Sequence, residues 1–143
     1  MKSGGKPSWI KARIPSGQNY QHLKNLTKKL NLHTVCQEAK CPNIGECWSA
    51  GTLTFMILGD TCTRSCGFCH VKTGRGGELD REEPGRVAEA VRSLTENNAR
   101  ITHVVITSVN RDDRNLDSAR IFAETITKVR QSNPEVNIEV LIP

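Results

Sequence analysis

This sequence is poor in aromatic side chains and has no long apolar run. Aromatic residues make up 4% of its 143 residues, and its mean hydropathy is -0.45. A helix that spans a bilayer needs about 20 consecutive apolar residues, and proteins that bind single-stranded nucleic acid interleave basic residues with stacking aromatic rings. Neither pattern occurs here. We therefore expect neither a membrane nor a nucleic acid as a partner.

Acidic side chains are absent from the first 37 residues. Seven Lys and Arg residues lie in that segment, whereas 13 basic and 15 acidic residues follow it. The net charge of +5 therefore originates in the N-terminal segment. Such a segment can attract an acidic partner over a distance, and it can equally be a solvated helix face. The sequence leaves both interpretations open.

Targeting features are also missing. No apolar signal-peptide core follows Met1, and the opening MKSGGKPSW lacks an Arg- and Ser-rich transit segment. We therefore expect a cytoplasmic location. Reducing compartments keep thiols free, so the cysteines are not expected to form disulfides.

All six cysteines lie in two triplets within 34 residues. Their close spacing suits a metal-thiolate site better than bridges between distant loops. Three thiolates leave one coordination position open for chemistry, whereas closed structural zinc sites and most iron–sulfur electron carriers take four protein ligands. We expect iron–sulfur sites, with a zinc-binding interaction module and a non-catalytic electron carrier as alternatives. The triplets are Cys36, Cys41 and Cys47, and Cys62, Cys66 and Cys69.

Apolar periodicity predicts an alternation of strands and helices after residue 50. Short apolar runs are typical of buried strands, and apolar stripes at spacings of three and four are typical of helices. The order strand–helix–strand–helix–strand favours a parallel sheet with right-handed crossovers. The predicted strands are 52–58, 101–107 and 136–142. One predicted helix begins at Pro84, and a second covers 117–131.

The two triplets occupy different contexts. A leucine stripe predicts a helix over 19–32, and the first triplet, at 36–47, is expected to lie on a loop around its metal. The second triplet follows the strand predicted at 52–58. Parallel α/β folds place their chemistry at the C-terminal ends of strands, and Gly67 permits a tight turn between two ligands. The second triplet is therefore the expected reaction centre.

The second triplet, CTRSCGFC, resembles the signature of the radical S-adenosylmethionine (SAM) superfamily. In that superfamily three thiolates hold a [4Fe–4S] cluster whose open iron binds SAM, and the reduced cluster cleaves SAM to a 5′-deoxyadenosyl radical. The resemblance implies this catalytic role for the second triplet. It also implies that Phe68 lies beside the adenine, while core packing is the alternative for this side chain.

The first triplet narrows the resemblance to the lipoyl synthase family. HTVCQEAKCPNIGECW is similar to that family's auxiliary-cluster motif, and KPSWIKARIPSGQNYQHLKNL and TSVNRDD also resemble family segments. The family implies two [4Fe–4S] clusters and SAM, with sulfur taken from the auxiliary cluster and inserted at C6 and C8 of a protein-bound octanoyl chain. The implied partners are an octanoylated lipoyl-accepting domain and an electron donor such as ferredoxin or flavodoxin.

Polar residues that follow the strand predicted at 101–107 are expected to line the SAM pocket, by position and by resemblance. Asp112 is expected to accept hydrogen bonds from SAM, and Arg111 to pair with a carboxylate. The alternative is an ordinary polar loop with surface Arg–Asp pairs. The group consists of Thr107, Ser108, Arg111, Asp112 and Asp113.

The resemblance implies a partial (β/α) barrel with an N-terminal cluster-binding extension. We expect residues 1–50 to form the arm, helix and auxiliary-cluster loop, and residues 51–143 to form the first half of the barrel. About half of the family's six strands are expected here, and the family's Arg-Ser-Ser-Tyr motif, whose serine completes the auxiliary cluster, does not occur. We therefore expect a fragment that is inactive on its own.

Overall fold

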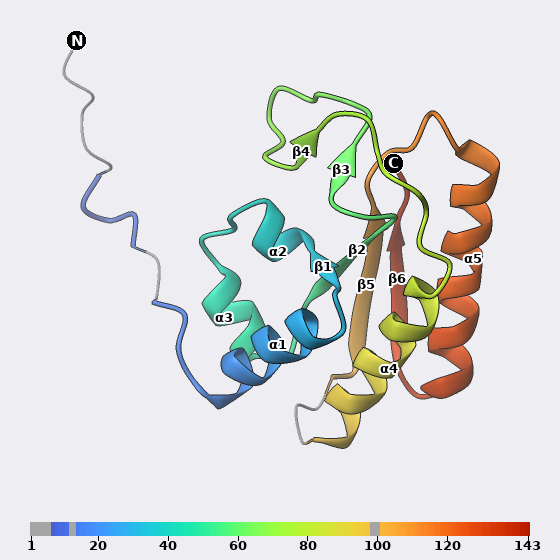
Figure 1. Cartoon of the computed structure of the whole chain (residues 1–143). Coiled ribbons are helices and arrows are strands. Elements are labelled where there is room, and N and C mark those ends of the chain that lie inside the picture. The colour runs from blue at the N-terminus through green and yellow to red at the C-terminus, as the bar shows by residue number, and fades with distance from the viewer. Residues whose placement is uncertain (1–6, 12–13, 98–100) are drawn as a thin grey trace, which may run out of the picture.

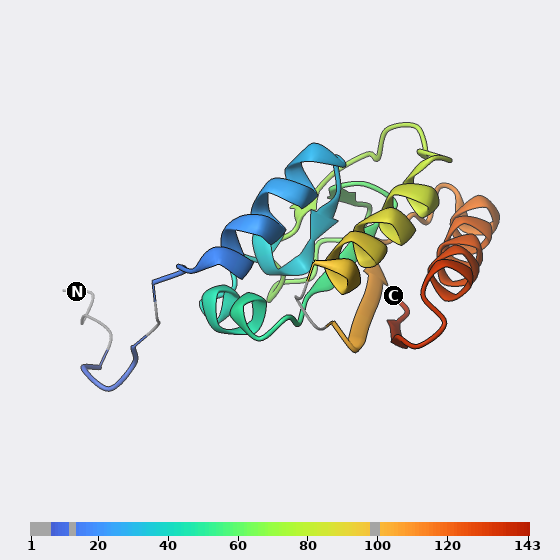
Figure 2. The ribbon, with the colours of Figure 1, turned by 90° about the horizontal axis from the view of Figure 1, so that it is seen from below.

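The computed structural model describes residues 7–11, 14–97 and 101–143. A four-stranded sheet lies at its centre, and helices pack along one face of this sheet (Figures 1 and 2). In sheet order the strands are β1 (His33–Thr34), β2 (Thr54–Ile57), β5 (His103–Ser108) and β6 (Asn137–Leu141). The longer helices are α1 (Gln18–Lys29), α4 (Glu83–Glu96) and α5 (Asn115–Ser132).

Strands β2, β5 and β6 are parallel, as the alternation of elements predicted. Val104 and Ile106 of β5 are fully buried, as expected for a central strand covered by helices. β6 lies at the edge of the sheet, and its Val140 is 42% exposed. The mixed α/β class with a partial parallel sheet is confirmed. Closure into a barrel and the division of the chain at residue 50 stay predictions.

The helix predictions after residue 50 are confirmed with small shifts at the ends. α4 begins one residue before Pro84, which occupies the first turn, where its missing N–H costs nothing. α5 begins two residues before the predicted start at Asp117. Both helices have buried stripes at helical spacing: Val87, Ala90, Val91 and Leu94 in α4, and Ile121, Phe122, Thr125 and Val129 in α5, where Ile126 is only partly buried. Among the described residues, no helix is long and apolar enough to cross a membrane.

The first triplet does not lie on a plain loop, so that prediction is wrong. Two short helices, α2 (Val35–Glu38) and α3 (Ile44–Ser49), occupy most of the segment. The side chain of Thr34 caps α2 by accepting a hydrogen bond from the backbone N–H of Gln37. Trp48 of α3 is fully buried, and its ring centroid lies 5.3 Å from that of Tyr20. Burial of Trp48 stabilises helical structure in this segment, although its apolar residues show little helical periodicity.

Two further features were not predicted. β1 pairs with β2 in the antiparallel sense, with His33 opposite Met56. The polar connector after the second triplet contains β4 (Lys72–Thr73), which pairs in parallel with β3 (Thr61–Cys62). β1, β3 and β4 have two residues each, too few for an apolar period to be recognised.

A buried carboxylate holds the turn that leaves β2. Leu58 and Gly59 follow the strand with φ angles of 71° and 92°, so two consecutive residues are left-handed. Leu58 donates its backbone N–H to the Glu83 carboxylate at 2.8 Å, and Glu83 is only 3% exposed. Burial raises the pKa of Glu83, while hydrogen bonds from the N–H groups of Leu58 and Gly59 oppose the increase. Glu83 therefore ties the start of α4 to the turn that leads into the second triplet.

This carboxylate should make stability depend on pH. Because the pKa of Glu83 is higher in the folded chain than its ordinary 4.5, the folded state binds the proton more tightly, and stability should fall as the pH rises above about 4.5. We expect Glu83→Gln to remove this part of the decline. Glu83→Ala should cost about 1–3 kcal/mol by leaving the Leu58 N–H unpaired. Urea unfolding at pH 4.5 and pH 7 measures both effects, and a difference between wild type and Glu83→Gln that is the same at both pH values would contradict the first.

Candidate functional site

The three cysteines of the first triplet are part-buried and lie on α2, on α3 and on the segment between them. Cys36 lies in α2, Cys47 lies in α3, and both pack against the hydrophobic core. Cys41 lies between the helices and donates its N–H to the Cys36 carbonyl at 3.1 Å. Burial raises the pKa of Cys47, and the neighbouring Cys36 and Cys41 raise it further. Cys36 and Cys41 therefore lie close enough to Cys47 to disfavour its thiolate form.

This donor set fits an iron–sulfur cluster chemically. A cationic metal group beside Cys47 would stabilise its thiolate form, and soft sulfur ligands suit iron–sulfur clusters. Among the described residues, no three Cys, His, Asp or Glu side chains converge as ligands of a single metal ion. Both cluster assignments stay predictions.

The second triplet projects from the body of the protein. Cys62 ends β3 and is part-buried, whereas Cys66 and Cys69 are exposed. The N–H of Cys69 donates to the Cys66 carbonyl at 3.0 Å, which closes a tight turn. Phe68 at this turn is 92% exposed, so core packing does not account for it. Its expected place beside an adenine stays a prediction.

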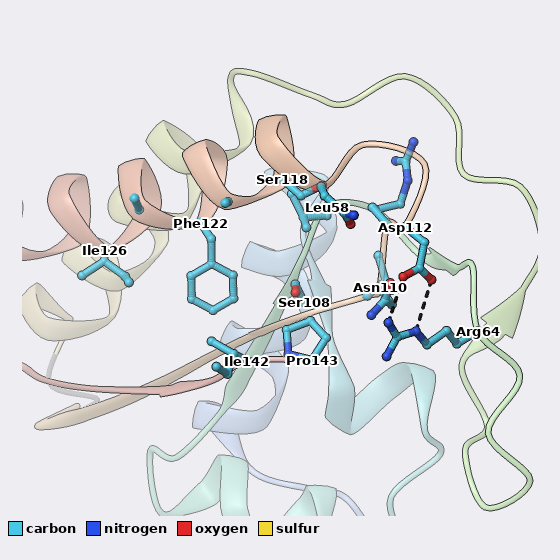
Figure 3. Close-up of a pocket in the computed structure, with 15 residues that line it drawn as sticks. Leu58, Arg64, Ser108, Asn110, Asp112, Ser118, Phe122, Ile126, Ile142 and Pro143 are labelled. Carbon is cyan, nitrogen blue, oxygen red and sulfur yellow. Dashed lines mark hydrogen bonds and ion pairs between the residues drawn. The ribbon is translucent and has the colours of Figure 1, made fainter.

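The loop that contains Thr63 and Arg64 is tied to the segment that follows β5. Asp112 accepts hydrogen bonds from Arg64 Nη2 at 2.8 Å and from Arg64 Nε at 3.2 Å (Figure 3). Thr63 Oγ1 donates to the same carboxylate at 2.8 Å. These bonds, those from Arg64 foremost, lower the pKa of Asp112. Asp112 is therefore ionised, and it joins two loops that are far apart in the sequence.

Cys62 is held by the same segment. Its sulfur accepts a hydrogen bond from the backbone N–H of Asn110 at 3.2 Å, and its carbonyl accepts one from Gly74 at 2.9 Å. The N–H of Thr63 donates to the Asn110 carbonyl at 3.0 Å. Sequence reasoning did not single out Thr63, Arg64 or Asn110, although they lie inside the CTRSCGFC and TSVNRDD segments.

The Arg111 guanidinium forms its hydrogen bonds with other groups of this chain. It is 4% exposed and donates two hydrogen bonds to Asp113, each 2.9 Å long. A third goes to the Gly77 carbonyl at 2.8 Å. Gly76 lies flat against the guanidinium, because a Cβ atom there would lie 2.5 Å from Arg111 Cζ. Arg111 thus holds the glycine-rich connector, and the expected roles of Arg111 and Asp112 toward SAM stay predictions.

A cavity of about 510 Å³ lies between α5 and the C-terminal end of β5 (Figure 3). Ser108 lines it, and the hydroxyls of Ser108 and Ser118 are buried with no hydrogen-bond partner among the described residues. Thr107 does not line it and instead donates its hydroxyl to the Leu141 carbonyl at 2.9 Å. Successive strand residues point to opposite faces, so the structure separates two residues that were expected to share a SAM pocket. Ser118 carries no signal in the sequence.

Comparison with known proteins agrees with the resemblance. Residues 3–41 match the family model described as the N-terminal domain of lipoyl synthase of the radical SAM family. The chain is 54% identical over 142 residues to the lipoyl synthase of Koribacter versatilis, a match that covers 99% of this chain and 45% of the relative. The lipoyl synthase of Rubrobacter xylanophilus is 55% identical over 139 residues, with coverages of 97% and 42%.

A eukaryotic relative shows a similar match. The mitochondrial lipoyl synthase of Nematostella vectensis is 49% identical over 138 residues, which are 96% of this chain and 46% of the relative. The chain therefore spans less than half the length of each of these curated relatives. By sequence, this chain is similar over nearly its whole length to the N-terminal portion of lipoyl synthases of the radical SAM family.

Proposed function

We propose that this chain provides the two cluster-binding motifs of a lipoyl synthase, a sulfurtransferase that inserts sulfur at C6 and C8 of a protein-bound octanoyl chain. The observation that carries the proposal is the pairing of two different cysteine triplets in one chain. One is part-buried between α2 and α3, and the other projects beyond β3. The identity of about half of all residues to lipoyl synthases supports the same reading.

The two triplets have different roles in the proposed reaction. When bound, a [4Fe–4S] cluster on Cys62, Cys66 and Cys69 supplies the electron for SAM cleavage, and one on the first triplet supplies sulfur. Acid–base side chains cannot cleave an unactivated C–H bond, so radical chemistry from a cofactor is required. Exposure of Cys66 and Cys69 leaves room for SAM on the outer side of the loop. Exposed Phe68 is available to lie against its adenine.

The partners and the location follow from this proposal. An octanoylated lipoyl-accepting domain is the substrate, and a ferredoxin or flavodoxin supplies electrons. The cytoplasmic location stays a prediction, and one relative is named as mitochondrial. A non-catalytic electron carrier and a zinc-binding interaction module are less well supported, because each requires four protein ligands per site and each triplet has three cysteines.

Iron content tests the two sites. After strictly anaerobic reconstitution we expect about eight iron atoms per chain, falling to about four when either triplet is replaced by alanine. Metal and sulfide analysis of the wild-type chain and of both triple variants measures this. Zinc with little iron would favour the interaction module, and loss of all iron in either triple variant would contradict two independent sites.

The response to SAM distinguishes the roles of the triplets. The reduced cluster on the second triplet should change its electron paramagnetic resonance (EPR) spectrum when SAM is added, because SAM binds the open iron. We expect Cys66→Ala to abolish this change and Cys41→Ala to preserve it. The opposite pattern would exchange the roles proposed for the two triplets.

We also propose that the 143 residues alone do not form the lipoyl group, since they span less than half of their relatives. An octanoylated acceptor domain incubated with the reconstituted chain, SAM and dithionite should show no mass gain from added sulfur. A full-length lipoyl synthase is the positive control. Sulfur addition by the chain alone would show that the rest of the relatives is dispensable.

A further inference from the structure

The strongest unexplained feature outside the sulfur ligands is the exposed ion pair between Arg64 and Asp112. It joins the interior of the Cys62–Cys66 loop to the segment after β5, across 48 residues of sequence. Both Arg64 donors meet the Asp112 carboxylate in a two-point arrangement, and Thr63 adds a third bond. A planar guanidinium fork gives such a pair directional as well as electrostatic strength.

The ion pair restrains a part of the loop that little else holds. Within residues 65–69, the only backbone hydrogen bond outside regular helices and strands in the described structure is the turn from Cys69 N–H to the Cys66 carbonyl. Cys66, Cys69 and Phe68 are all exposed, so core packing does not position them. The loop therefore meets the body of the protein through Cys62, Thr63 and Arg64.

The exposure of the pair argues for a local role. The side chains of Arg64 and Asp112 are 57% and 46% exposed, and surface pairs of this kind add little to global stability. The contact therefore restrains one loop and adds little to the stability of the whole fold. Arg64 lies between the first two cysteines of the triplet, and the conformation of this segment sets the distance between their thiols.

We infer that Asp112 is a positioning residue that presets the Cys62–Cys66 loop for cluster binding by holding Thr63 and Arg64. The restraint is made by this chain's own side chains, and only the identity of the bound group rests on the proposed function. This assignment differs from the sequence-based expectation that Asp112 binds SAM directly. In the structure the Asp112 carboxylate already receives three hydrogen bonds from the loop.

Amide hydrogen exchange of the metal-free chain tests the inference without any cluster. We expect Asp112→Ala to make the Thr63 N–H, now bonded to the Asn110 carbonyl, exchange about threefold to fivefold faster, the size expected when a surface ion pair is lost. Glu124→Ala is the matched control, because it removes another exposed ion pair, to Lys128 at 2.8 Å, from the surface of α5. This control should exchange at Thr63 like the wild type.

Cluster assembly gives the second measurement. Under limiting iron, the EPR signal of the second-triplet cluster should form more slowly in Asp112→Ala than in wild type, and Asp112→Asn should be intermediate because its amide oxygen still accepts from Thr63. Unchanged exchange at Thr63 in Asp112→Ala, or faster exchange in the control as well, would overturn the inference. Wild-type exchange and assembly with loss of only the response to SAM would also overturn it, in favour of direct SAM contact.

Failure of the proposed function would look different. A wild-type chain that takes up no iron would count against the cluster sites, while the exchange comparison would still decide whether Asp112 restrains the loop.

Discussion

The parallel pairing of β2 with β5 is the constraint on which the candidate site depends. Ile57 lies opposite Ser108, and the N–H of Val109 continues the ladder to the Ile57 carbonyl at 3.2 Å. Both strands therefore end at the same edge of the sheet. The chain leaving β2 becomes the second cysteine triplet, and the chain leaving β5 becomes the segment with Asp112. Without this register the two loops would not meet.

Two buried ionisable side chains hold the same edge through hydrogen bonds. Glu83 receives the N–H of the turn after β2, and Arg111 holds the glycine-rich connector and Asp113. Charged groups are costly to bury unless their hydrogen bonds are satisfied. The hydrogen bonds of Arg111 meet that condition, whereas burial outweighs those of Glu83 and raises its pKa. They restrain the chain on either side of the second triplet, while the exposed Arg64–Asp112 pair restrains the triplet itself.

The elements that were predicted correctly are those whose apolar residues repeat regularly along the sequence. α4, α5 and the three parallel strands each show an apolar repeat, and they appear within a few residues of the predicted ends. The helices around the first triplet were missed because they depend on the Thr34 cap and on the burial of Trp48 beside Tyr20. Such contacts override weak local preference.

The sequence by itself determined the order of the longer helices and strands, the two cysteine triplets and the resemblance to lipoyl synthases, because periodicity, spacing and motif similarity are local properties of the chain. Only the tertiary structure decided which distant side chains meet. It paired Arg64 with Asp112, bonded the buried Arg111 to the Gly77 carbonyl, and put Ser108 but not Thr107 on the cavity beside α5. These outcomes depend on strand register and on the alternation of side chains across a sheet, and a residue's position in the chain does not specify them.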